Sequence, residues 1–156
     1  MSGNNADRLD QFVVVSRMLL ELDELPSALA GVYLGMVDER WPIWPLADMA
    51  ATFAQWRDLP AETRERLIIE ALGANEWLPY AEGVLNVWFS GQLFVDDTNT
   101  TFVDAPAEAY LGALVWGLLH THPSGMPGPF FGEWAYPPSD DITWVHTPSP
   151  TRRGAR

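Results

Sequence analysis

The chain has no cysteine and no lysine, and its nine basic residues are all arginines, set against 21 acidic residues. The lack of cysteine excludes disulfides, thiolate metal ligands and a cysteine nucleophile. The net charge of −12 argues against a nucleic-acid partner, because phosphate neutralisation requires stripes of Lys and Arg. We also expect no membrane span and no export signal, since the first residues (MSGNNADRLDQ) lack a basic region followed by an apolar one.

The composition of the sequence indicates a folded chain that is rich in aromatic residues. Hydrophobic residues make up 47% and charged residues 19% of the 156 positions, a balance typical of globular domains. With eight Trp, seven Phe and four Tyr, some rings are expected at the surface, where exposed aromatics mark partner-binding sites. The 13 prolines and 12 glycines predict long irregular segments.

Apolar residues recur at helical spacing in six stretches of the chain. Turn residues separate several of them, as in WPIWP at 41–45 and the polar run DDTNTT at 96–101. Within the fourth stretch we expect Glu62 and Arg66 to pair at i,i+4 and Gly73 to end the helix. The sequence therefore predicts an all-α fold, a compact bundle of about six helices over residues 9–20, 25–39, 46–56, 60–73, 78–88 and 106–119.

One domain followed by a tail is the expected organisation. Residues 1–7 are predicted to be disordered, and residues 8–138 to form a single helical domain. From about residue 120 this domain continues as an extended C-terminal tail of Pro, Gly and aromatic residues, a composition that fits neither a helix nor an ordinary strand. Residues 139–156 are predicted to be a flexible C-terminus.

The sequence HTHPSG, which begins at His120, has two interpretations. With Asp140 or Asp141, the histidines His120 and His122 resemble the ligands of the JAMM family of zinc isopeptidases, where two histidines and an aspartate hold zinc. The spacing differs from that motif, because Ser139 directly precedes Asp140 and the stretch after His122 is longer and filled with aromatics. The helical N-terminal half also offers no strand for that family's glutamate. Alternatively, both histidines cap a helix C-terminus, where imidazole suits the helix dipole.

Another resemblance extends over residues 9–138. Its elements, in chain order, are LDQFVVVSRMLL, the segment 23–34, the run Trp88-Phe89-Ser90-Gly91, a helix with Tyr110 and Trp116, and HTHPSGMPGPFFGEWAYPP. In this order they resemble the small subunit of FAD-dependent sugar and alcohol dehydrogenases, the sorbitol, fructose and glucose dehydrogenase complexes of bacterial envelopes. The chain departs from that pattern in a longer segment at 58–75 and in having no cysteine near the tail.

The resemblance implies a protein without an active site of its own. It implies a non-catalytic accessory subunit that supports the folding, stability or export of a large catalytic subunit of the glucose-methanol-choline oxidoreductase type. That partner would bind FAD, so no cofactor, metal or catalytic residue is expected in this chain. A cytochrome c subunit is a further partner that the family allows. The family implies the periplasm or cell envelope, and the missing export signal leaves the cytoplasm open.

The residues expected to contact the partner are aromatic or lie beside aromatics. A Pro/Gly/aromatic tail can lie extended along a partner, where proline lowers the ordering cost and rings fill pockets. The alternative is that the tail folds back over the chain's own helices and covers Trp88 and Trp116. The interface candidates are Trp88, Phe89, Gly91, Tyr110, Trp116, Phe130, Phe131, Trp134 and Pro137.

Overall fold

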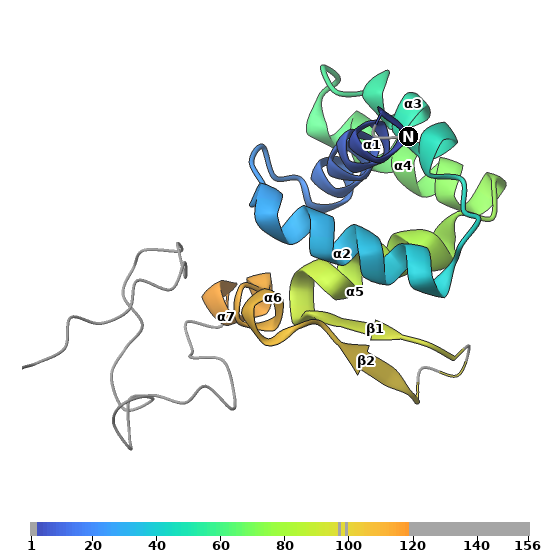
Figure 1. Cartoon of the computed structure of the whole chain (residues 1–156). Coiled ribbons are helices and arrows are strands. Elements are labelled where there is room, and N and C mark those ends of the chain that lie inside the picture. Colours follow the sequence, from blue (N-terminus) through green and yellow to red (C-terminus); the bar gives the residue numbers. More distant parts are fainter. Residues whose placement is uncertain (1–2, 97, 99, 119–156) are drawn as a thin grey trace, which may run out of the picture.

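The computed structural model of the chain describes residues 3–96, 98 and 100–118. Within these residues it contains seven helices and one two-stranded hairpin (Figure 1). None of the described helices combines the length and hydrophobicity that crossing a bilayer requires. The elements are α1 (Gly3–Leu20), α2 (Ser27–Arg40), α3 (Leu46–Ala54), α4 (Ala61–Ala74), α5 (Leu78–Ser90), β1 (Gln92–Phe94), β2 (Phe102–Asp104), α6 (Ala107–Leu111) and α7 (Leu114–Leu118).

The predicted all-α fold is confirmed. Helices α1 to α5 correspond to the first five predicted stretches and pack into a compact bundle, with α1 in contact with α2, α3 and α5 (Figure 1). The hairpin and the short helices α6 and α7 lie together on one side of this bundle. The predicted tail from about residue 120 and the segment 139–156 lie outside the described residues.

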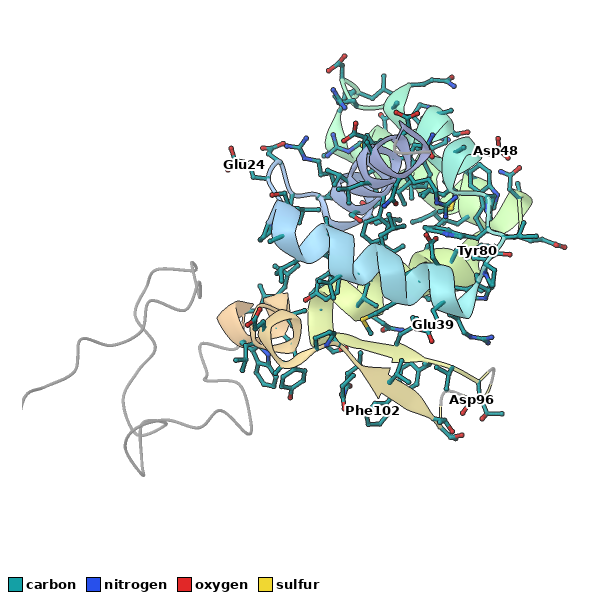
Figure 2. All side chains as sticks on the ribbon, in the orientation of Figure 1. Glu24, Glu39, Asp48, Tyr80, Asp96 and Phe102 are labelled. Carbon is teal, nitrogen blue, oxygen red and sulfur yellow. The ribbon has the colours of Figure 1, made fainter. Side chains whose placement is uncertain are left out.

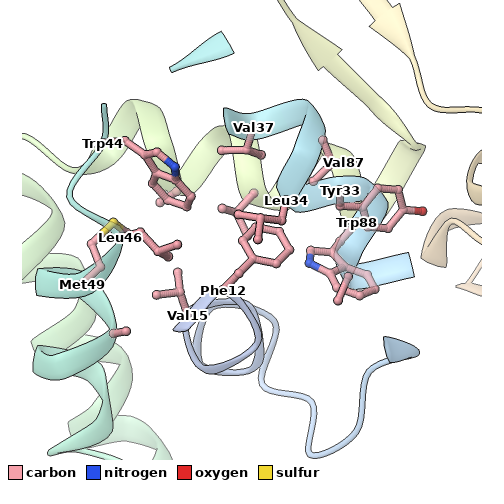
Figure 3. Packing of buried hydrophobic residues seen from close by; sticks show 14 of the residues in the cluster. Phe12, Val15, Tyr33, Leu34, Val37, Trp44, Leu46, Met49, Val87 and Trp88 are labelled. Atoms are coloured by element: carbon pink, nitrogen blue, oxygen red, sulfur yellow. The ribbon is translucent and has the colours of Figure 1, made fainter. Parts of the chain in front are cut away.

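Aromatic rings from three helices meet in the core of the bundle (Figure 3). Trp88 of α5 stacks with Phe12 of α1 at a centroid distance of 6.4 Å and meets Tyr33 of α2 edge-on at 4.8 Å. All three side chains are fully buried, and fully burying a side chain of this kind contributes about 1.5–3 kcal/mol. Beside them, the Asp38 carboxylate accepts hydrogen bonds from Arg8 and from the Trp44 indole, which ties α1 to the end of α2.

The N-terminal boundary differs from the prediction. Residues 3–7 were expected to be disordered with the rest of 1–7, but α1 already begins at Gly3. Once a helix has nucleated, each further residue adds a hydrogen bond at little cost. The buried face around Phe12 and Val15 supplies that nucleus, so the helix extends through the polar residues before it.

The predicted helix 106–119 is wrong as a single element, because it divides into α6 and α7. Gly112 ends α6, and its N–H donates to the carbonyl oxygens of Glu108 and Ala109. A Cβ at this position would lie 2.8 Å from Cδ1 of Leu29 on α2. The glycine therefore allows the end of α6 to approach α2, a long-range contact that helical periodicity cannot indicate.

The hairpin was not predicted either. Gly91 ends α5 in the left-handed conformation with φ 67°, which glycine adopts without steric cost, and the chain leaves the helix to form β1. The loop expected at 96–101 is present between the strands. Strands β1 and β2 pair antiparallel, with Gln92 opposite Asp104 and Phe94 opposite Phe102. Three residues in each strand are too few to show a clear alternation in the sequence.

Candidate functional site

Trp88 is a core residue and not the surface residue that the resemblance suggested. Its side chain is 0% exposed, and its indole N–H donates a 2.9 Å hydrogen bond to the hydroxyl of Ser16. Phe12 and Tyr33 cover the ring from two sides. The chain's own helices therefore bury Trp88 completely, and the expectation that it contacts a partner is corrected.

Gly91 and Phe89, which flank the end of α5, differ in their surroundings. A Cβ at Gly91 would lie 2.9 Å from the Cα of Tyr110, so this glycine serves the approach of α6 within the chain. Phe89, in contrast, remains 39% exposed. Of these two interface candidates, Phe89 has a side chain that a partner can reach.

Tyr110 and Trp116 join α6 to α7. Their rings meet edge-on at 5.4 Å, and the Trp116 indole donates a 2.9 Å hydrogen bond to the carbonyl oxygen of Tyr110. Both side chains are half-buried. Their contacts therefore hold α7 against α6.

The remaining candidates lie outside the described residues. In the described part of the chain, no group of three or more His, Asp or Glu side chains is placed to hold a metal ion. The candidate residues outside that part are the interface residues Phe130, Phe131, Trp134 and Pro137 and the metal candidates His120, His122, Asp140 and Asp141.

The β hairpin presents two different faces. Leu93 and Val103 are paired across the strands and share one face. That face turns toward α5, since Leu93 is buried and its Cδ1 lies 3.4 Å from the position of a Cβ on Gly83. Phe94 and Phe102 share the opposite face, where their rings meet edge-on at 6.2 Å. The hairpin therefore carries an aromatic pair on the side that the bundle does not cover.

Strand β2 is exposed along its whole length. Phe102 is 48% exposed and Val103 is 46% exposed, and Figure 2 shows Phe102 on the hairpin away from the helices. Sequence reasoning missed both residues. The signal for them was weak: a β-prone Phe-Val pair between a polar loop and Pro106.

The outer edge of β2 has no partner strand within the described residues. The Val95 N–H donates to the Thr101 carbonyl, and the Ala105 N–H donates to the Gly91 carbonyl. Hydrogen-bonded and non-hydrogen-bonded pairs alternate in an antiparallel ladder. Phe102 and Asp104 are therefore in non-hydrogen-bonded pairs, and their backbone N–H and C=O groups point away from β1.

Asp96 organises the loop between the strands and lies at the tip of the hairpin (Figure 2). Its Oδ1 accepts 3.0 Å hydrogen bonds from the backbone N–H groups of Thr98 and Thr100. Hydrogen bonds from the Thr101 hydroxyl, the Thr100 N–H and the Thr98 hydroxyl hold the pKa of this carboxyl far below its ordinary value of 3.8. The loop is therefore built around an ionised carboxylate.

A shallow pocket of about 230 Å³ lies on the far side of the bundle, between α1, the end of α3 and α4. Three arginines line it, but Arg64 is already paired with Glu21 at 3.2 Å, and Asp23 also lines the opening. The charges of the lining side chains nearly cancel. This pocket gives no preference for one class of ligand. The hairpin, in contrast, gathers exposed apolar side chains beside backbone groups that no described residue pairs with.

Compared with protein-family models, curated proteins and solved structures, the chain matches none of them. No family follows from these comparisons. The hairpin surface, defined as Phe94, Phe102, Val103 and the outer edge of β2, is the candidate site that the described residues offer.

Proposed function

We propose that the chain is a non-catalytic small subunit that binds a large FAD-dependent sugar or alcohol dehydrogenase subunit of the glucose-methanol-choline type and supports its folding, stability or export. The resemblance over residues 9–138 supplies the identity of the partner. The hairpin surface is the observation that favours a binding role. A partly exposed aromatic pair beside a strand edge that no described residue pairs with is typical of surfaces that another protein covers.

Binding is sufficient for such a subunit to stabilise its partner. A protein that binds only the folded state of another stabilises that state by about 2.7 kcal/mol at a concentration of 100 Kd. The accessory subunit thus needs a complementary surface and a stable bundle of its own. Exposed rings such as Phe102 and Phe89 are the kind of residue that dominates binding energies when a partner buries them.

Co-expression tests this function. The chain is produced with the large flavoprotein subunit encoded in the same genome, and soluble yield, FAD content and dehydrogenase activity are compared with and without it. We expect a co-purifying complex and a rise in all three quantities. Identical values in both cultures, with no complex, would refute the proposal. Stoichiometric zinc in the purified chain, lost on His122→Ala, would instead favour the JAMM-type zinc hydrolase.

A further inference from the structure

We infer that the partner subunit contributes an extended segment that pairs with the outer edge of β2 as a third strand. This inference rests on the proposed function, in which a partner subunit exists, and names the surface and the mode of binding. The backbone N–H and C=O groups of Phe102 and Asp104 point outward. An extended segment laid along β2 pairs with these groups, and its backbone hydrogen bonds provide the affinity.

The side chains of β2 define what lies next to the added strand. Neighbouring strands place side chains of the same face close enough to interact. A residue beside Phe102 meets an exposed aromatic ring, and a residue on the opposite face meets Val103, which is also half exposed. The segment therefore carries apolar side chains that contact both faces of β2.

The negative charge of the hairpin favours a basic residue in the partner's segment. The hairpin is acidic, with Asp96 at its tip and Asp104 at the end of β2, and Glu108 follows in α6. An Arg or Lys near Asp104 complements this charge and steers the encounter. A second copy of this chain is the less suitable occupant, because a net charge of −12 opposes self-association.

Hydrogen bonds within the chain support the extended form of the hairpin. Asp96 fixes the loop through hydrogen bonds from Thr98 and Thr100, and the Gln92 side-chain amide donates a 2.8 Å hydrogen bond to Asp104. A surface that is already in its bound conformation loses less entropy on association. The partner's segment thus meets a template whose edge is already extended.

Two variants at one position isolate the backbone contribution. Asp104→Pro removes the side chain and the outward N–H but keeps the hydrogen bonds between β1 and β2, since proline is tolerated on an edge strand whose N–H faces solvent. Asp104→Ala removes the same side chain and keeps the N–H. In titrations of the purified large flavoprotein subunit, we expect Asp104→Pro to bind about tenfold more weakly than Asp104→Ala. Circular dichroism melts compare the folding of the two variants.

Amide hydrogen exchange of the unmodified chain gives a second measurement. In the isolated full chain the amides of Phe102 and Asp104 are expected to exchange rapidly, and in the complex at least about tenfold more slowly. Two results overturn the inference and leave the proposed function standing. One is a complex in which these two amides exchange as fast as in the isolated chain. The other is equal affinity of Asp104→Pro and Asp104→Ala for the large subunit. Failure to form any complex overturns both. Slow exchange of these amides in the isolated chain also overturns the inference, because the edge of β2 is then already covered. Light scattering measures the oligomeric state: a dimer indicates a second copy on the edge, and a monomer indicates the chain's own C-terminal segment.

Discussion

The indole N–H of Trp88 depends on one hydroxyl group for its hydrogen bond. Ser16 supplies it from α1, and both side chains are 0% exposed. A buried donor without a partner costs the free energy of its desolvation. The small polar side chain of Ser16 therefore belongs to the core as much as the rings around it.

Replacing Ser16 tests this interaction. We expect Ser16→Ala to lower the free energy of unfolding by about 1–3 kcal/mol, because the Trp88 N–H remains buried with no acceptor. Urea denaturation followed by circular dichroism measures the change. Ser90→Ala is the matched control: the Ser90 hydroxyl donates to the Asn86 carbonyl on a partly exposed helix end, so its effect should stay within about 0.5 kcal/mol. Equal effects of the two variants would contradict the argument.

The loop at Asp96 should resist acid. Because the hydrogen-bonded carboxyl has a pKa lowered from 3.8, the stability that it provides is complete above the unfolded-state value. It is lost as pH falls from there through the folded-state value, and the folded carboxyl stays ionised over most of that interval. NMR shifts of the Thr98 and Thr100 amides should therefore stay constant from pH 7 down to about pH 3. Asp96→Ala should displace both shifts at every pH. A midpoint near the ordinary aspartate pKa would show that the loop does not hold the ionised form.

The sequence could suggest aromatic residues as interface candidates but could not show which of them are exposed. Trp88 and Phe89 are adjacent, yet the first is fully buried and the second is partly exposed. Their order in the sequence gives no means of choosing between them, because the choice depends on where Phe12 and Tyr33 lie. The ion pair of Arg66 also could not be chosen from the sequence. Glu62 and Glu70 are both four residues from Arg66; we expected Glu62, but the structure pairs Arg66 with Glu70.

At the scale of helices, two glycines have opposite roles. Around Gly83 on α5 there is no room, because a Cβ would lie 2.5 Å from the Trp41 ring. Around Gly35 on α2 nothing lies within 4 Å. One glycine therefore permits close packing, and the other only weakens its helix.

Alanine substitutions should separate these roles. We expect Gly83→Ala to destabilise the protein by about 1–3 kcal/mol, since the Trp41 ring must move. Gly35→Ala should stabilise it by about 0.5–1 kcal/mol through a lower entropy cost of helix formation. Thermal melts of both variants beside the parent chain measure the two shifts. Shifts of the same sign would contradict the packing described around Gly83.

The elements that the sequence predicted well are those whose signal is local and repeated. Helices α1 to α5 each bury a stripe of apolar residues over several turns, and this helical period can be recognised from the sequence alone. The break between α6 and α7 falls at Gly112, which lies close to Leu29, 83 positions earlier in the sequence. The hairpin is built from strands of only three residues. The candidate site was missed for this reason, because it lies in the elements that long-range contacts define.

At the scale of the whole molecule, the tail of Pro, Gly and aromatic residues supplies a separate prediction. Trp134→Ala should weaken association with the large flavoprotein subunit about 30-fold, the effect of removing a hot-spot residue worth about 2 kcal/mol. The helicity of the isolated chain should not change. Trp144→Ala is the matched control, because Trp144 lies beyond the stretch 9–138 that carries the resemblance. Co-purification unaffected by Trp134→Ala would show that this ring does not contribute.

The hydrogen bond from the Tyr33 hydroxyl to the Ala109 carbonyl, 2.7 Å long and buried, fixes α6 to the bundle. Because the Trp116 indole donates to the Tyr110 carbonyl, this hydrogen bond also helps to hold α7, which ends at Leu118. The hairpin and α7 both pack against α5, so the hairpin and the segment joined to α7 are attached to one bundle. If both contact the same subunit, the first contact raises the effective concentration of the second, and avidity can exceed either affinity by about 10²–10⁴-fold. The buried Tyr33 hydroxyl, which holds α6, then contributes to whether two modest contacts act as one strong one.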